Sequence, residues 1–470
     1  MRTKITAGFL GLTLIALFIA YGYYFGLIAR LSASVDTISN DFSIFYFSAQ
    51  YHHAGESLYK TATKTFVSTV ENEGHVYSYF LPSGNLNPPF FNLIFLPIAK
   101  LAIGYAFLLW AVLSLAAAIA AIMLLQRQFI PNKTSTITRV ALVVGVLCYF
   151  PTFVNTKTGQ LGLYVFLLLS LLWILSHNKK DTLAGFLLGL LVNIKLFTGL
   201  FGIFFVVQRR WRLVIWSAVS WIVSSLCALA AFGKQSYIDY YESIKHVGNW
   251  YTYNWNASLY GFLLRMFGGK GHDYPLFMQP WLPPILQNIC VILCLLLVVW
   301  FSWRYEKQSQ EEYDFKFAFI LVTMLFISPL GWIYYFPVLI IAYWATLQIL
   351  PRVKEARSMF RLTWLSFFLS AMPVAMLVTK NQTDPVRDFI WANYNFLALA
   401  ILMLVLIYVR AAWRNTVEVG SNPYPKRFLK WALLLVVFFA ILPHGILGSA
   451  GALYCYGTPL QLADILHLEN

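Results

Sequence analysis

One acidic side chain in a long polar interval is the first candidate for chemistry. Asp41 follows an apolar segment long enough to span a membrane, and it begins the stretch DFSIFYFSAQYHHAGESLYK. A carboxylate held at a membrane–water boundary could act as a general base that takes a proton from an acceptor hydroxyl. The alternative is an ordinary loop acid or helix cap, because Ser39, Asn40 and Asp41 are all good capping residues. Taken alone, the stretch favours capping.

A basic side chain inside an apolar run is the second candidate. Lys195 lies near the middle of the apolar run 181–208. A Lys within a membrane span costs about 2.5–3.5 kcal/mol on insertion scales, and such residues usually face a bundle interior or a water-filled cavity. Snorkelling of the side chain to the membrane surface is the alternative. The central position favours a functional cation that binds an anion.

Two further features lie at the starts of predicted helices. Gln160 opens an apolar helix just after Lys157, and its side chain is suited either to cap that helix or to bind a sugar or phosphate. The stretch 86–101 places paired prolines at a helix start, where a missing N–H group leaves nothing unpaired. Pro97 should then break or tilt this short element. Capping is the commoner role for a residue such as Gln160.

Aromatic and amide side chains are concentrated in the stretch 240–268, and further aromatic residues follow in 327–343. Such mixtures are common in sugar-binding sites, where rings stack on the apolar faces of sugars. An aromatic belt at the membrane interface is the alternative for both stretches. Arg265 is suited to hold a phosphate. The other candidates in these stretches are His246, Asn254, Asn256, Ser258, Trp332, Tyr334 and Tyr335.

The composition indicates the environment of these residues. Of the 470 residues, 59% are hydrophobic and 11% are charged, and the mean hydropathy is +0.66. Soluble domains carry about 25% charged residues, so this composition indicates a polytopic membrane protein. The formal charge of +15 comes from short Lys and Arg clusters between apolar runs, a pattern typical of cytoplasmic loops rather than of nucleic-acid binding. The five cysteines show no metal-ligand spacing.

About thirteen apolar segments, with about 11–14 as the range, predict an all-α bundle of transmembrane helices. Two long polar intervals, 30–87 and 233–280, interrupt them. Placing the basic clusters in the cytoplasm puts the amino terminus inside and both long intervals outside. The basic cluster at 177–181 can lie in the cytoplasm only if 88–102 or 181–208 is re-entrant or broken. The sequence leaves both options open. The segments are 5–29, 88–102, 103–126, 138–155, 160–176, 181–208, 211–232, 281–303, 315–328, 331–350, 358–378, 388–410 and 428–448.

Several motifs of other enzyme classes do not occur in the sequence. It contains no nucleotide-binding motif, no HExxH and no GxSxG, and the outer intervals contain no DxD. A nucleotide-sugar-dependent enzyme and an ATP-driven pump are therefore unsupported, and we expect neither a cofactor nor a metal. Internal repeats of the kind found in many secondary transporters are not evident either.

These features, in this order, resemble glycosyltransferase family 87, membrane-embedded enzymes of the GT-C fold that include polyprenyl-phosphate-mannose-dependent mannosyltransferases. The resemblance covers roughly residues 35–345. One departure concerns the position after the SPxxW motif, where we expect His and the chain has Tyr334 and Tyr335; a tyrosine or His246 would then take the part of that His. The motifs are carried by Asp41, Tyr46, Ala49, Gly55, Tyr59, Asn87, Pro88, Pro89, Phe90, Pro97, Gly159, Gln160, Lys195, Arg209, Arg210, Trp211, Asn256, Ser258, Leu259, Arg265, Ser328, Pro329 and Trp332.

The resemblance implies an inverting transfer of a sugar, with mannose the family-typical one, from a polyprenyl-phosphate donor to an acceptor hydroxyl of a glycolipid or glycan. Asp41 would be the catalytic base. Lys195, Arg265 and His246 would bind the donor phosphate. The sugar and the acceptor would contact Tyr46, Asn87, Gln160, Asn256, Ser258, Trp332, Tyr334 and Tyr335.

The resemblance also implies a location and a division of the chain. Residues 1–350 would form a GT-C-like catalytic module in the plasma (inner) membrane, with the active site on the extracytoplasmic face. Residues 351–470 would add further transmembrane helices. Two other functions remain open: a multi-spanning transporter or lipid flippase, and a transferase of the O-antigen ligase or polymerase type. The missing repeats count against the first, and the early position of the longest outer interval counts against the second.

Overall fold

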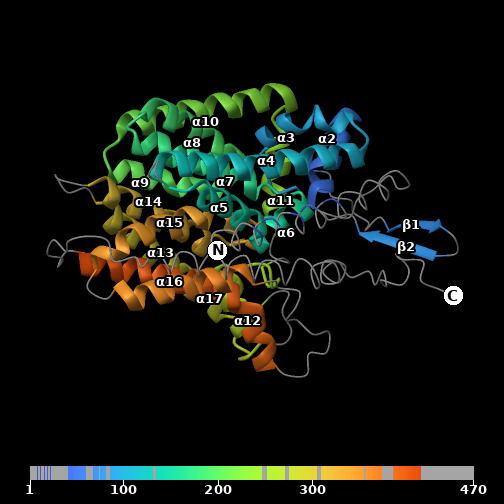
Figure 1. Ribbon diagram of the computed structural model, residues 1–470. Coiled ribbons are helices and arrows are strands. Elements are labelled where there is room, and N and C mark those ends of the chain that lie inside the picture. Colours follow the sequence, from blue (N-terminus) through green and yellow to red (C-terminus); the bar gives the residue numbers. More distant parts are fainter. Residues whose placement is uncertain are drawn as a thin grey trace.

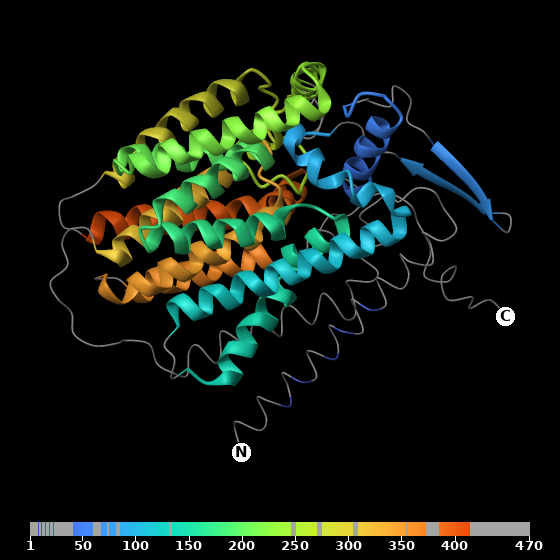
Figure 2. The ribbon, with the colours of Figure 1, turned by 90° about the horizontal axis from the view of Figure 1, so that it is seen from above.

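The computed structural model describes residues 41–59, 67–72, 75–80, 85–130, 134–245, 251–269, 275–303, 309–353, 356–372 and 385–413, together with five isolated positions between residues 8 and 22. The predicted helices at 5–29, apart from those positions, and at 428–448 lie outside the described residues, as does His246. Within the described part the chain is helical except for one antiparallel hairpin, β1 (Val67–Asn72) and β2 (His75–Phe80), in which Val67 pairs with Phe80. Figures 1 and 2 show this hairpin beyond the helices.

The predicted fold class, a helical polytopic membrane protein, is confirmed. Four of the described helices are long and apolar enough to cross a membrane, and the pair α5–α6, bent by 54°, would be a fifth. The helices are α2 (Asp41–His53), α3 (Pro89–Phe95), α4 (Ile103–Phe129), α5 (Thr136–Cys148), α6 (Phe150–Thr158), α7 (Gly162–His177), α8 (Asp181–Ile194), α9 (Leu200–Val207), α10 (Trp211–Phe232), α11 (Gln235–Lys245), α12 (Leu259–Phe267), α13 (Leu282–Ser302), α14 (Gln310–Ile327), α15 (Leu339–Ile349), α16 (Ala356–Ala371) and α17 (Pro385–Trp413). Short 3₁₀ helices are η1 (Ile98–Lys100), η2 (Leu196–Gly199), η4 (Ile333–Val338) and η5 (Leu350–Arg352).

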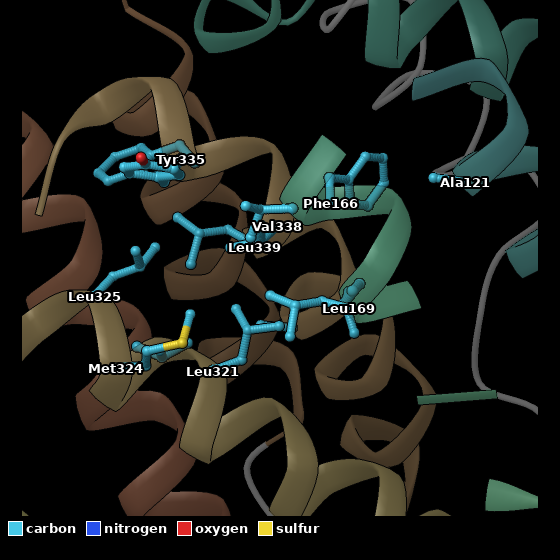
Figure 3. Close-up of a cluster of buried hydrophobic side chains, with 14 of the residues drawn as sticks. Ala121, Phe166, Leu169, Leu321, Met324, Leu325, Tyr335, Val338 and Leu339 are labelled. Atoms are coloured by element: carbon cyan, nitrogen blue, oxygen red, sulfur yellow. The ribbon is translucent and has the colours of Figure 1, made fainter. Parts of the chain in front are cut away.

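The buried core lies between α4, α7, α14 and the η4–α15 segment. Figure 3 shows Phe166 and Leu169 of α7 with Leu321 of α14 and Leu339 of α15, and Tyr335 at the edge of the same cluster. In contrast, α10 and α13 carry rows of exposed Ile, Leu, Val and Trp side chains. Apolar side chains left uncovered along a whole helix are typical of a surface that faces lipid.

The predicted apolar segment 88–102 is a pair of short elements. It forms α3, which is seven residues long, and then η1, which starts after Pro97. Seven helical residues rise about 10 Å, which is a third of the thickness of a bilayer core. Its rings pack against α2 instead, with the centroids of Phe91 and Phe45 5.0 Å apart and those of Phe95 and Phe42 5.5 Å apart. This segment therefore supports α2 and does not cross the bundle.

The predicted apolar segment 181–208 is broken at Lys195 and turns back. Its first arm is α8, Lys195 is extended (φ −147°, ψ 110°), and η2 with α9 forms the second arm. The side chain of Asp181, at the start of the first arm, contacts Arg210, which follows the second. The two ends of the segment therefore meet, and Lys195 lies at the tip of a re-entrant hairpin. The basic cluster at 177–181 therefore lies at the same end of the bundle as 209–212. Because 88–102 does not cross the membrane either, both clusters can lie in the cytoplasm.

Close packing against α10 fixes the first arm of this hairpin (Figure 1). A Cβ atom on Gly185 would lie 2.3 Å from the carbonyl oxygen of Leu213, so only glycine permits this approach. Nearer the tip, Asn193 Nδ2 donates to the carbonyl of Trp221 at 2.8 Å and to Ser224 Oγ at 2.6 Å. These bonds fix the end of α8, and with it Lys195, beside Trp221 and Ser224 of α10.

The re-entrant course of 181–208 predicts the sidedness of its flanking residues. In a variant whose five native cysteines are replaced, we expect Asn178→Cys and Arg209→Cys to react with an impermeant maleimide from one side of the membrane. Tyr253→Cys, at a side chain that is 57% exposed near the other end of the bundle, should react from the opposite side. Labelling of positions 178 and 209 from opposite sides would show that the segment spans the membrane.

Candidate active site

Four of the predicted site residues come together: Asp41, Gln160, Lys195 and Tyr335. The Gln160 side chain hydrogen-bonds to the Asp41 carboxyl group, and Lys195 attracts the same carboxylate electrostatically. Tyr335 is within electrostatic range of Asp41, and its ring centroid is 5.6 Å from Lys195 Nζ. These residues come from the start of α2, the α6–α7 turn, the break after α8, and η4.

Gly159 determines how α2 approaches the α6–α7 turn. Its φ of +67° is in the left-handed region, which glycine adopts freely as it ends a helix. A Cβ atom there would lie 2.5 Å from the Cβ of Phe42, the residue after Asp41. The carbonyl of Gly159 accepts a hydrogen bond from Trp110 Nε1 at 2.8 Å. Gly159 therefore allows Asp41 and Gln160 to lie next to each other.

Asn155 holds the Gln160 turn against η4. Its carbonyl accepts the Gln160 N–H at 3.0 Å, and its side-chain Nδ2 donates to the carbonyl of Tyr334 at 3.3 Å. A Cβ atom on Gly162 would lie 1.8 Å from that same carbonyl oxygen, so the two segments are in direct backbone contact. Because Tyr335 follows Tyr334, this contact also fixes the position of the Tyr335 ring relative to Gln160.

Two buried polar atoms of the site have no hydrogen-bond partner in the described part of the chain. They are Gln160 Oε1 and the hydroxyl of Tyr335, and these side chains are 6% and 1% exposed. A buried polar group without a partner costs about 1–3 kcal/mol, and such groups are rare in native structures. Their position beside the Asp41–Lys195 pair makes them suitable partners for hydroxyl or phosphate oxygens of a ligand.

The charge of Asp41 depends on three neighbouring influences. Burial raises the pKa of the Asp41 carboxyl above its ordinary value, while the hydrogen bond from Gln160 and the charge of Lys195 lower it. Burial is the largest of the three. A carboxylate with a raised pKa is a stronger base than an exposed aspartate, and it is the kind of group that general-base catalysis uses.

The predicted aromatic residues form a row that begins at the site. Trp332 stacks on Tyr334 with ring centroids 5.7 Å apart, and Tyr334 lies 5.0 Å from Tyr335. Phe197, two residues after Lys195, contacts the other side of Tyr335 at 5.0 Å. Trp332, at the outer end of the row, is half-buried, whereas Tyr334 and Tyr335 are buried.

Asn256 and Ser258 clamp two segments together. Asn256 Nδ2 donates to the carbonyls of Tyr251 and Pro329, and its Oδ1 accepts from the N–H groups of Ser258 and Gly331. An amide has two donors and two acceptor positions, so its capacity is fully used. Ser258 Oγ caps α12 and donates to Pro329. These two side chains position the 329–335 segment, and the geometry leaves Asn256 nothing for a sugar.

Arg265 is buried, and protein oxygens surround its guanidinium. Its Nε donates to Asn393 Oδ1 at 2.9 Å, and its two terminal nitrogens donate to the carbonyls of Tyr253 and Asn256, each at 2.9 Å. It therefore orders the segment that precedes α12. This geometry does not favour the predicted contact with a donor phosphate.

The remaining predicted residues lie on α2 and below it. Tyr46 Oη donates to the carbonyl of Leu101 at 2.8 Å and so anchors α2 to the end of η1. Asn87 is buried beneath α2, where its carbonyl accepts from Tyr59 Oη at 2.7 Å and its Oδ1 lacks a partner. Among the described residues, no group of three His, Cys, Asp or Glu is arranged to hold a metal ion.

Sequence reasoning missed several residues that position the site. Asn155 ends the predicted segment just before Gln160, and Asn193 lies in the same segment as Lys195; an amide in an apolar helix was the available signal. Asn85 was missed as well: its Nδ2 donates to Ser48 on α2 at 3.0 Å and to Asn92 on α3 at 2.9 Å. Its position just before the paired prolines gave no sign of that role.

Comparison with known proteins identifies a family. The chain matches Glycosyltransferase family 87 over residues 85–329, which is just over half of its length. It is also similar to the polyprenol-phosphate-mannose-dependent alpha-(1-2)-phosphatidylinositol pentamannoside mannosyltransferase of Mycolicibacterium smegmatis, with 26% identity over 298 residues. That alignment covers 61% of this chain and 66% of the relative, so the chain spans just under two thirds of the relative's length.

The contact at Gly162 predicts a sharp effect of one methyl group. Gly162→Ala forces the turn of Gln160 away from Tyr334, and we expect a loss of about 1–3 kcal/mol of stability, seen as a lower midpoint of thermal unfolding in detergent. Gly202→Ala, in α9, is the control because no atom lies within 4 Å of its added Cβ. Equal midpoints for the two variants would contradict the backbone contact.

Proposed function

The chain belongs to glycosyltransferase family 87, and from that premise we propose that it transfers a sugar, mannose in the first instance, from a polyprenyl phosphate to an acceptor hydroxyl. The observation that carries the proposal is the half-buried Asp41 carboxyl beside Lys195 and Gln160. Mannose and the polyprenyl carrier are suggested by the name of the mycobacterial relative. The family match includes Gln160 and Lys195 but not Asp41 or Tyr335, which the fold adds from outside it.

The proposed reaction is a single displacement. Asp41 accepts the proton of the acceptor hydroxyl as that oxygen attacks the anomeric carbon of the sugar. The bond between that carbon and the phosphate oxygen breaks, and the phosphate leaves with the negative charge, next to the Lys195 ammonium. A phosphate needs little protonation to leave at neutral pH, so one carboxylate is enough, in contrast to the pair used by glycoside hydrolases.

The neighbouring side chains are assigned by their free hydrogen-bonding capacity. We assign Gln160 Oε1 and the Tyr335 hydroxyl to oxygens of the donor, because both are buried without a partner next to the reacting groups. Tyr335 would thus stand where the family resemblance led us to expect His. We assign the half-buried Trp332, whose ring stacks on Tyr334, to contact with the sugar.

Other predicted ligands take different roles in this proposal. Asn256, Ser258 and Arg265 position the segments that carry the aromatic row, and Tyr46 anchors α2. His246 remains a predicted phosphate ligand in the second outer interval. Asn87 remains a predicted acceptor ligand, since its Oδ1 is buried without a partner.

The proposed side of the membrane follows from the distribution of charge. The basic residues at 177–181 and 209–212 lie at the end of the bundle away from Asp41, because α7 begins beside Gln160 and ends at His177. Basic loops are retained on the cytoplasmic side. The site would then face the extracytoplasmic side of the plasma membrane, where a lipid-linked donor and a glycolipid or glycan acceptor are both accessible.

Removal of the base provides the direct test. We expect Asp41→Asn to lower sugar transfer from polyprenyl-phosphate mannose by about a thousandfold, since a general base contributes 10²–10⁴-fold, while the protein still inserts and folds. Glu242→Gln is the matched control, because that exposed carboxylate interacts only with its neighbour Lys245 among the described ion pairs. Full activity of Asp41→Asn would remove Asp41 as the base, and failure of the unaltered protein to consume any lipid-linked sugar would favour a transporter or flippase.

The pH dependence provides a second test. The base is active only when deprotonated, so kcat/KM should fall as the pH drops through the pKa of Asp41, which burial places above that of an exposed aspartate. The Gln160 hydrogen bond lowers that pKa. Gln160→Leu should therefore move the acidic limb of the kcat/KM profile to higher pH, in addition to lowering its plateau. A lower plateau with an unmoved limb would mean that Gln160 does not contact the base.

A further inference from the structure

The connections at the base of the re-entrant hairpin form a basic patch, which we define as Lys179, Lys180, Arg209 and Arg212. All four side chains are exposed. Lys179 and Lys180 lie between α7 and α8, Arg209 lies between α9 and α10, and Arg212 is in the first turn of α10. The contact between Asp181 and Arg210 brings the two connections together. This patch is at the opposite end of α7 and α8 from Gln160 and Lys195, so the proposed reaction does not use it.

The backbone of the patch is held in an unfavourable conformation. Lys179 has a φ of +57° and Arg209 a φ of +55°, and among the described residues these are the only ones other than glycine with positive φ. Glycine adopts this region freely, whereas a side chain there is uncommon. Both positions nevertheless carry a cation. Such outliers are most common where the structure serves a function, which supports a role for these charges.

The acids near the patch are engaged elsewhere. Asp181 contacts Arg210, Asp314 lies 2.8 Å from His177 Nδ1, and Glu312 lies 2.9 Å from Lys316 Nζ and 3.1 Å from Arg410. Glu311, half-buried on the first turn of α14, adds one negative charge at this end. The basic patch therefore keeps a clear excess of positive charge at its surface.

Next to the patch, α10 exposes an apolar surface with tryptophans at its edge. Trp211 is 56% exposed, Ile215 59% and Trp216 40%, and Trp303 at the end of α13 is 55% exposed. Tryptophan is enriched where the hydrocarbon of a bilayer meets the head groups. Arg209 and Arg212 flank Trp211 in sequence, and the contact between Asp181 and Arg210 brings Lys179 and Lys180 to the same end. The four cations therefore lie at the level of the lipid phosphates, with the apolar face of α10 beside the acyl chains.

We propose that the basic patch binds the head group of an anionic phospholipid, on the side of the membrane opposite the candidate active site. The guanidinium groups of Arg209 and Arg212 are suited to bidentate contact with a phosphate, and the two lysines add charge. The acyl chains would lie along Trp211, Ile215 and Trp216. The bound lipid would join the two connections at the base of the hairpin whose tip carries Lys195.

The experiment is a competition between lipids for the purified full-length protein. The protein in detergent is offered equal amounts of phosphatidylglycerol and phosphatidylethanolamine with identical acyl chains, and native mass spectrometry counts each bound lipid. Each basic residue near an anionic lipid surface strengthens binding about fivefold, so K180Q/R209Q/R212Q should reduce the preference for phosphatidylglycerol on the order of a hundredfold at low salt.

Two further variants make the result decisive. R127Q/R357Q/R361Q removes the same charge from exposed arginines of α4 and α16 and should keep the preference within about threefold of the unaltered protein. K180R/R209K/R212K keeps the charge and should keep most of the preference, losing only the bidentate contribution of the two arginines, which separates loss of charge from damage to the fold. An unchanged preference in K180Q/R209Q/R212Q, or an equal loss in the α4 and α16 variant, would overturn the proposal.

Discussion

The placement of one cation within an apolar bundle is the constraint on which the rest of the structure depends. Lys195 needs a partner for its charge, and Asp41 provides it from a helix that is not part of a membrane span. Four parts of the chain meet around this pair, and none of them is a continuous α-helix there. α2 begins at the pair, α6 turns into α7, α8 ends, and the 3₁₀ helix η4 lies beside them. Each interruption leaves polar backbone inside the protein, away from lipid, where it can be tolerated.

The two ends of the bundle use charge differently. At the end away from the site, the first turns of α14 carry Glu312, Asp314 and Lys316, which contact α7, α13 and α17 through ion pairs and hydrogen bonds. These contacts close that end. At the site end, Gln160 and Tyr335 keep buried polar atoms without partners. The unpartnered atoms of Gln160 and Tyr335 lie beside the Asp41–Lys195 pair, so hydrogen-bonding capacity remains where the proposed ligand would bind.

The sequence was sufficient for the helical membrane class and the family resemblance, and it marked 88–102 and 181–208 as alternative places for an interruption, because hydropathy, proline and a mid-span lysine all report local properties. It could not show that both segments are interrupted, because hydropathy does not distinguish an apolar segment that crosses the membrane from one that turns back. Nor could it separate Gln160 from Asn256. Both are amides in polar motifs, but the hydrogen-bonding groups of the Asn256 side chain are all occupied by backbone, including that of Pro329 and Gly331. Only the tertiary structure shows that Asn256 has no capacity left for a ligand.

The base of the proposed reaction is positioned by contacts that do not involve Lys195. Tyr46 and Gln50 bond to the carbonyls of Leu101 and Ala99, and Asn85 bonds to Ser48, so α2 is docked along its length. The carboxylate of Asp41 is therefore in place before a substrate binds. Preorganised charge of this kind lowers a barrier because no reorganisation is needed during the reaction. The same docking explains why a helix outside the family match belongs to the site: it brings the Asp41 carboxylate to Lys195, a half-buried cation within an apolar bundle.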